Sequence, residues 1–210
     1  MIKNIIFDFD GTIADSINLG IELYNELAEK YGFLKINKED FEYLRNLSVI
    51  EKCKALHVPL FKLPVFGIEF MKNYRQALDS LKTFDGINEV IYELKHKGYR
   101  LNIISSNSHE NVSEFLKKNG IDLFDSIDCI NSIFGKDKAI RSFIKKHSVN
   151  KEELVYIGDE NRDIDACKVN SIKCIAVSWG VDSIELLKRA RPDFIVNSPP
   201  EIIGIVGLNH

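Results

Sequence analysis

The sequence predicts an α/β fold in which helices cover a mostly parallel sheet and a helical module follows the first strand. Short apolar runs alternate with helical patterns from residue 83 onward, which is typical of parallel sheets because each crossover needs a helix. Residues 16–82 break this alternation and contain only helical patterns. We therefore expect an α/β core made of residues 1–15 and 83–210, and a helical cap made of residues 16–82.

Six short runs rich in β-branched and aromatic residues are the candidate strands. They are Ile2–Phe9, Tyr99–Ser105, Ser126–Ile130, Leu154–Ile157, Ile172–Val177 and Phe194–Val196. Because helical patterns separate them, we expect the strands to pair in parallel.

Helices of the core are marked by their ends. Two helical patterns stop at glycines that fit C-terminal caps, Gly98 and Gly120. Asn150 with Glu153 resembles a capping box, and Asp182 before Glu185 predicts a helix start there. The two glycine-capped helices are expected at Asn88–Lys97 and Glu110–Asn119.

The inserted segment is expected to hold four helices. A capping box formed by Ser48 and Glu51 starts the third, and prolines at 59 and 64 separate it from the fourth. The expected helices are Ile17–Lys30, Lys38–Asn46, Val49–His57 and Val65–Lys82.

Composition limits the classes of function. The 210 residues have a hydrophobic content of 45% and a charged content of 28%, as in ordinary globular proteins, which predicts one domain with an inserted module. The net charge of -3, without a block of Lys or Arg, argues against nucleic acid or a membrane surface as the partner. No signal peptide is recognisable, and the four cysteines show no CxxC spacing. We expect a cytoplasmic protein, a monomer or a weak homodimer.

The first strand ends in two carboxylates, Asp8 and Asp10, followed by Gly11. Side chains two residues apart on a strand point to the same side, and Gly11 permits a sharp exit and a close approach of the backbone to a ligand. Two like charges held so close are costly unless a cation, a phosphate environment or a shifted pKa relieves them. The pair is therefore a candidate site.

Three further polar segments follow predicted strands. They are Ser105-Ser106-Asn107, Gly135-Lys136 and Gly158 to Asp163. Because the carboxyl ends of parallel strands meet at one edge, we expect all four segments to converge. Carboxylates can hold Mg²⁺, while a hydroxyl, backbone N–H groups and a lysine can stabilise phosphoryl oxygens. The combination indicates phosphoryl transfer.

In these segments the chain resembles hydrolases of the haloacid dehalogenase superfamily, in the subgroup of phosphoglycolate phosphatases and β-phosphoglucomutases with a helical cap after the first strand. The family's motifs have the forms DxDGT, Ser or Thr often followed by Asn, Lys, and GDxxxD. They are matched in order by Asp8-Phe9-Asp10-Gly11-Thr12, Ser106-Asn107, Lys136, and Gly158-Asp159 with Asp163. The resemblance spans the whole chain and implies a Rossmann-like core.

The resemblance implies how the catalytic groups act. Asp8 would attack phosphorus and become an aspartyl phosphate. Asp10 would protonate the leaving oxygen and then activate water. Ser106 and Lys136 would bind phosphoryl oxygens.

It also implies the groups around them. Mg²⁺ would be held by Asp8, the backbone carbonyl of Asp10 and Asp159. Asp163 would support the metal's water shell or orient Lys136. Thr12 would organise the first loop, and Asn107 would contribute to binding the substrate.

Some assignments have rivals. Ser105 is an alternative to Ser106, which we favour because Asn107 follows it, and Lys138 is an alternative to Lys136. In the cap, Arg45 and Ser48 either face the substrate's polar end or serve as a surface residue and a helix cap. Glu160 and Arg162 are expected to have local structural roles.

The expected function is a Mg²⁺-dependent phosphatase that hydrolyses a small cytosolic phosphomonoester through an aspartyl-phosphate intermediate. A β-phosphoglucomutase-like phosphomutase is the alternative within the same fold. From another class, a non-catalytic phosphate-binding or receiver-like signalling module also combines acids, a hydroxyl and a lysine. A dehalogenase is disfavoured because it needs no second carboxylate at the position of Asp10.

Overall fold

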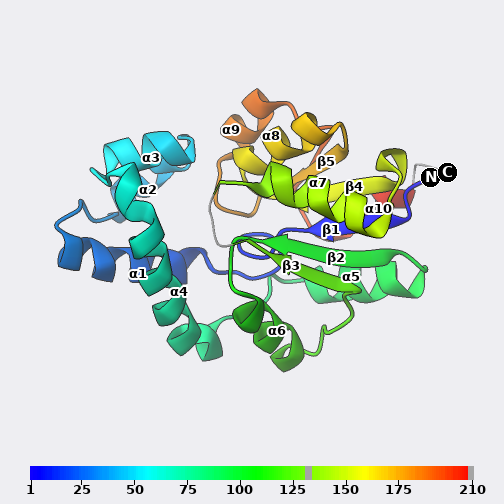
Figure 1. Ribbon diagram of the computed structural model, residues 1–210, viewed down its shortest axis with the longest axis horizontal. Coiled ribbons are helices and arrows are strands. Elements are labelled where there is room, and N and C mark those ends of the chain that lie inside the picture. The colour runs from blue at the N-terminus through cyan, green and yellow to red at the C-terminus, as the bar shows by residue number, and fades with distance from the viewer. Residues whose placement is uncertain (131–133, 208–210) are drawn as a thin grey trace.

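A computed structural model describes residues 1–130 and 134–207 (Figure 1). Its six strands form one sheet of order β3-β2-β1-β4-β5-β6, and the neighbouring strands pair in parallel. The strands are β1 (Asn4–Phe7), β2 (Arg100–Ser105), β3 (Ser126–Cys129), β4 (Leu154–Gly158), β5 (Lys173–Val177) and β6 (Phe194–Val196). The predicted α/β fold with a parallel sheet is confirmed.

Strand β1 lies between β2 and β4, where it brings three polar segments together. Phe7 pairs with Ile103 of β2 and Ile157 of β4, so the three strands end at nearly the same level. In open parallel sheets ligands bind in the crevice at the carboxyl ends of the strands, where the strand order reverses. Here the order reverses at β1, directly before Asp8.

Helices cover both faces of the sheet, and the side chains of β1 alternate between these two faces. Ile5 and Phe7 pack with one set of helices, and Ile6 packs with the other. The first set is α5 (Ile87–His96), α6 (His109–Lys118) and α10 (Pro200–Gly207). The second set is α7 (Lys136–His147), α8 (Asn161–Asn170) and α9 (Ile184–Ala190).

Four further helices form a group beside the sheet, at the left of Figure 1. Phe66 lies among the rings of Tyr24, Tyr31, Phe33 and Phe70, which joins the first and last helices of the group. The helices are α1 (Ile17–Tyr31), α2 (Lys38–Leu44), α3 (Val49–Ala55) and α4 (Leu63–Ala77), with short 3-10 turns at Leu60–Lys62 and Leu78–Ser80.

The two connections between this group and the sheet run side by side. The N–H of Asp15 donates to the carbonyl of Lys82, and the N–H of Phe84 donates to that of Ile13. Ala14 also forms an antiparallel bridge with Thr83. The chain therefore leaves and rejoins the sheet at one place.

Two predicted helix starts are corrected. Asn150 accepts a hydrogen bond from the N–H of Glu152, but the residues after it, Lys151–Glu153, form a 3-10 turn and not an α-helix. Ser183 caps α9 in place of Asp182, because its hydroxyl accepts from the N–H of Leu186.

Other expectations hold with small shifts. The Ser48 capping box is confirmed at the start of α3. The last helix of the insertion begins at Leu63, with proline in its first turn, and ends at Ala77 before the 3-10 turn. Within the described residues, no helix combines the length and the apolar character needed to cross a bilayer.

Stability should depend on the sheet's core far more than on the outer surface of α4. Ile103 is fully buried in β2, whereas Ile68 on α4 is 72% exposed. We expect Ile103→Ala to lower the free energy of unfolding by about 2–5 kcal/mol, because it leaves a cavity. Ile68→Ala should change it by less than about 0.5 kcal/mol. Urea unfolding followed by circular dichroism measures both, and equal effects would contradict this account of the core.

Candidate active site

The first loop places Asp8 at the floor of the site. Its N–H donates to the carbonyl of Ile157 at 2.8 Å, and its Oδ1 accepts from the N–H of Phe9 at 2.8 Å. The chain then turns at Gly11, whose φ of +75° favours glycine. A Cβ on Gly11 would lie 2.1 Å from Oδ2 of Asp159, so the glycine lets that carboxylate approach the loop.

Lys136 joins the first and last motifs. It is buried at the first turn of α7, and its Nζ forms ion pairs with Asp8 and Asp163. Oδ2 of Asp163 accepts from the N–H of Glu160 at 3.1 Å, which anchors it to the start of α8. Lys138, the alternative lysine, is exposed. The structure therefore places Lys136 in the site.

Asp10 is held by two donors from different parts of the chain. Its Oδ2 accepts from the side-chain amide of Asn107 at 2.9 Å, and its Oδ1 accepts from the hydroxyl of Tyr74 at 2.8 Å. Burial and the nearby Asp10 keep the pKa of Tyr74 well above its usual value, so this hydroxyl stays protonated and donates. Asn111 donates to Oδ1 of Asn107 at 3.0 Å, which fixes the amide. Sequence reasoning missed Tyr74.

Asp159 is tied to two loops by hydrogen bonds. The hydroxyl of Thr12 donates to its Oδ1 at 2.9 Å, and the N–H of Val181 donates to its Oδ2 at 2.7 Å. The indole N–H of Trp179 donates to the carbonyl of Thr12 at 3.3 Å. Thr12 thus connects the first loop to Asp159.

The two serines after β2 lie differently. Ser105 is buried, and its Oγ accepts from the N–H of Asn107 at 3.0 Å. Ser106 lines a cavity, and its Oγ accepts from Arg162 at 3.4 Å. Of the two, Ser106 is the one that a substrate can reach.

The site carries an excess of buried negative charge. Its carboxylates are Asp8, Asp159, Glu160 and Asp163, and the cations beside them are Lys136 and Arg162. These four buried carboxylates against the two cations leave a charge of -2 when all six groups are ionised, and the half-buried Asp10 adds a further negative charge when it is ionised.

The pKa values follow from burial and from this crowding. Burial raises the pKa of Asp8 despite the opposing effect of Lys136. Burial and the neighbouring acids raise the pKa of Asp159 well above its usual value, and burial raises that of Asp163 to about 6. Burial would also raise the pKa of Glu160, but Arg162, Lys136 and Lys52 together outweigh burial and lower the value to about 2. At Asp8, Asp159 and Asp163 the nearby positive charge does not offset the effect of burial on the pKa.

The donor set fits a divalent cation. Carboxylate oxygens of Asp8, Glu160 and Asp163 lie within 4.8 Å of one another in the described part of the chain. Mg²⁺ prefers such oxygen ligands, and its two charges would balance the excess of -2. Glu160 was not among the expected ligands. Asp159 was expected but lies outside this group of three, with its oxygens bonded to Thr12 and Val181.

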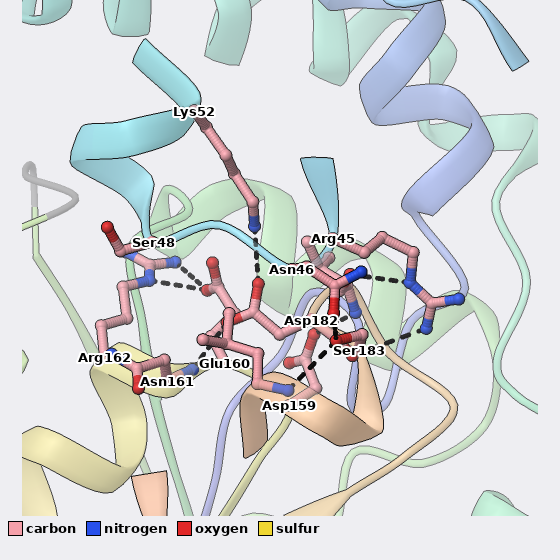
Figure 2. A network of polar contacts seen from close by, with 12 residues as sticks. Arg45, Asn46, Ser48, Lys52, Asp159, Glu160, Asn161, Arg162, Asp182 and Ser183 are labelled. Atoms are coloured by element: carbon pink, nitrogen blue, oxygen red, sulfur yellow. Dashed lines mark hydrogen bonds and ion pairs between the residues drawn. The ribbon is translucent and has the colours of Figure 1, made fainter. Parts of the chain in front are cut away.

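The helical group closes over the site through polar contacts (Figure 2). Lys52 of α3 forms an ion pair with Oδ1 of Asp182 at 2.6 Å, and Oδ2 of Asp182 accepts from the N–H of Asn161 at 2.7 Å. Arg45 donates to the carbonyls of Val181 at 3.1 Å and of Gly180 at 3.0 Å. Arg45 therefore lies beside the site, and its guanidinium contacts backbone of the loop after β5.

A cavity of about 390 Å³ lies between the helical group and the sheet. Its wall on the sheet side includes Asp10, Ser106, Glu160 and Arg162. Helices of the insertion supply most of the remaining wall with apolar side chains. Asp10 and Glu160 thus connect the acidic site to a partly open cavity.

The haloacid dehalogenase-like hydrolase profile matches residues 5–177, which span all four motifs. The chain belongs to this family. The expected resemblance is confirmed, and the chain is a hydrolase of the haloacid dehalogenase-like family.

Two curated relatives match this chain over nearly its full length. A phosphoglycolate phosphatase of Synechococcus elongatus is 27% identical over 203 residues, covering 96% of this chain and 96% of the relative. The pyrophosphatase PpaX of Listeria innocua is 25% identical over 211 residues, covering 98% of this chain and 96% of the relative.

The fold is also shared with a solved structure. A haloacid dehalogenase-like family hydrolase from Streptococcus pneumoniae superposes with a TM-score of 0.79 at 22% identity, covering 97% of this chain and 98% of that chain. Its likeness shows that the fold of this hydrolase is that of the family.

The ion pair between Lys52 and Asp182 should stabilise this hydrolase measurably. The side chain of Asp182 is 4% exposed, so Lys52→Met leaves a buried carboxylate without its partner. We expect the free energy of unfolding to fall by about 1.5–3 kcal/mol, the range for a hydrogen bond to a charged group. Denaturant titration measures this loss. Lys54→Met, an exposed lysine on the same helix, is the control, and an equal effect of both changes would refute the assignment.

Proposed function

We propose that this hydrolase is a phosphatase that removes the phosphoryl group of a small phosphomonoester in the cytoplasm. The observation that carries the proposal is the convergence of Asp8, Lys136 and Asp163 beside Asp10 at the edge of the cavity. The relatives' names, a phosphoglycolate phosphatase and a pyrophosphatase, support hydrolysis of phosphate compounds. The four cysteines are free, which suits a reducing compartment.

In the first step, an oxygen of Asp8 attacks phosphorus, and the bond between phosphorus and the ester oxygen breaks. The ion pair with Lys136 favours the charged form of this carboxylate, and the hydrogen bond from the N–H of Phe9 holds its Oδ1 in place. Asp10 gives its proton to the departing oxygen. Tyr74 and Asn107 fix the orientation of the Asp10 carboxyl while it does so.

In the second step, water attacks the aspartyl phosphate on Asp8. Asp10, now charged, takes the proton of that water, so inorganic phosphate leaves and both carboxyl groups return to their starting states. Ser106 and Lys136 bind the phosphoryl oxygens, and Thr12 holds the loop that carries both acids. One carboxyl group thus serves as acid and then as base.

The residues proposed to hold Mg²⁺ are Asp8, Asp163, Asp159 and the backbone carbonyl of Asp10. Asp8 and Asp163 belong to the cluster of buried carboxylates, whereas Glu160 in that cluster is paired with Arg162. A bound Mg²⁺ supplies positive charge that stabilises the phosphoryl oxygens during transfer.

Residues 16–82 are proposed to act as a cap that excludes water from this chemistry. The contacts of Arg45 and Lys52 with the core, and the bond from Tyr74 to Asp10, support a catalytic site completed by the cap. A phosphomutase is the weaker alternative, because the largely apolar wall of the cavity is a poor match for a sugar's hydroxyl groups.

Replacing the two acids separates their roles. Asp8→Asn should reduce phosphate release from p-nitrophenyl phosphate to background, because the amide cannot form the covalent intermediate. Asp10→Asn should reduce kcat by about 10²–10⁴-fold, the usual contribution of a general acid and base. Asp15→Asn changes an exposed acid nearby and should keep the wild-type rate. Wild-type turnover by Asp8→Asn would exclude Asp8 as the nucleophile.

Removal of the metal should abolish turnover. Treatment with EDTA should bring phosphate release to background, and added Mg²⁺ should restore it. Because two buried charges are then balanced, Mg²⁺ should also raise the melting temperature of the wild type, and less so that of Asp163→Asn. Full activity in EDTA would refute the metal requirement.

A further inference from the structure

The cavity between cap and core is lined mostly by apolar side chains. Beyond the acids near β1, its wall is formed by side chains such as Ile17, Ile21, Leu44, Phe66, Phe70 and Met71. Its volume of about 390 Å³ is within the range of small-molecule pockets, roughly 300–1,000 Å³. The space is therefore suited to an apolar group of moderate size.

The charged side chains and the tyrosine hydroxyls of the cap at this cavity are already engaged in contacts with the protein. The described lining residues of the cap include two cations, and Lys52 is paired with Asp182 while Arg45 donates to the carbonyls of Gly180 and Val181. The hydroxyl of Tyr24 donates to the carbonyl of Leu34, and that of Tyr74 donates to Asp10.

This cavity is an unfavourable environment for an anionic leaving group. It would lie among apolar side chains and close to the carboxylates of Asp10 and Glu160. The cations of the same lining, Arg45, Lys52 and Arg162, are already bonded to carbonyls and carboxylates of the protein. Burying a charge without a partner is strongly unfavourable. The wall therefore selects against a second negative charge on the substrate.

Two glycines keep part of the cavity open. Gly20 of α1 and Gly67 of α4 lie within helices and line the cavity, and a Cβ added at either would meet no atom within 4 Å. Close packing of helices does not explain them, and glycine inside a helix costs stability relative to alanine. The space that a side chain would fill at these two positions therefore remains available to a ligand.

We infer that this cavity receives an uncharged, apolar leaving group of the phosphomonoester, an aromatic or branched aliphatic alcohol. The inference rests on the proposed phosphatase function and narrows its substrate class. It separates this chain from the phosphoglycolate phosphatase and the pyrophosphatase that it resembles, because glycolate and phosphate are both anions.

Two alkyl phosphates of similar intrinsic reactivity test the inference. With Mg²⁺ present, kcat/KM for 2-phenylethyl phosphate should exceed that for phosphoglycolate by about tenfold or more, since apolar pockets discriminate by about 10–200-fold per methylene group. Each ester releases inorganic phosphate and an alcohol, so one phosphate assay serves both. Equal or reversed preference would overturn the inference.

Variants that fill the cavity provide a second test of the inference. Gly67→Leu and Gly20→Leu should each lower the ratio of kcat/KM between the two esters by about tenfold, because the leucine occupies the leaving group's space. Gly204→Leu is the matched control: Gly204 also lies within a helix and has open space around it, but lies on α10 outside the cavity. Thermal melts establish that the variants fold. An unchanged ratio in both cavity variants would refute the inference.

Binding of the product alcohol distinguishes this inference from the proposed function. Failure of the wild type to hydrolyse any phosphomonoester would refute the phosphatase, not the cavity assignment. Ligand-detected NMR with 2-phenylethanol then decides the latter. Binding that is lost in Gly67→Leu and kept in Gly204→Leu supports the assignment, whereas equal signals from all three proteins would overturn it.

Discussion

The ammonium group of Lys136 holds the site together, because it lies between the carboxylates of Asp8 and Asp163 in a fully buried environment. Burial alone would lower the pKa of this lysine, but the two acids raise it above its usual value, so the charge persists. Without that charge, the carboxylate that follows β1 and the one in the first turn of α8 would repel each other away from water. The remaining imbalance of -2 makes the same place receptive to a metal ion.

Sequence reasoning recovered what local patterns encode. The six strands, the paired acids and the lysine lie where short-range signals predict, because strand ends and turns leave clear marks. It missed Tyr74, which reaches Asp10 across 64 residues and belongs to no motif. It also assigned the start of α9 to Asp182, whose carboxylate instead accepts from Asn161 and pairs with Lys52. Contacts between cap and core depend on how two units meet, and no local spacing encodes that.

The charged residues of the helical group at the site contact the rest of the chain. Arg45 and Lys52 bind backbone carbonyls and a carboxylate of the loop after β5, so these contacts fasten the helical group to the sheet domain. Apolar side chains remain to face the interior of the cavity. Polar contacts at the rim thus attach the helical group, whereas apolar side chains determine the shape of the cavity interior.

The paired connections at Ala14 and Thr83 also bear on how such a protein changes over evolution. Because the chain leaves and rejoins the sheet at adjacent points, an insertion there of almost any length costs the sheet little in loop closure. The core can therefore accept a different cap without rebuilding its strands. Tyr74 limits this freedom, since a replacement module must supply another donor to Asp10 or leave the acid less well oriented.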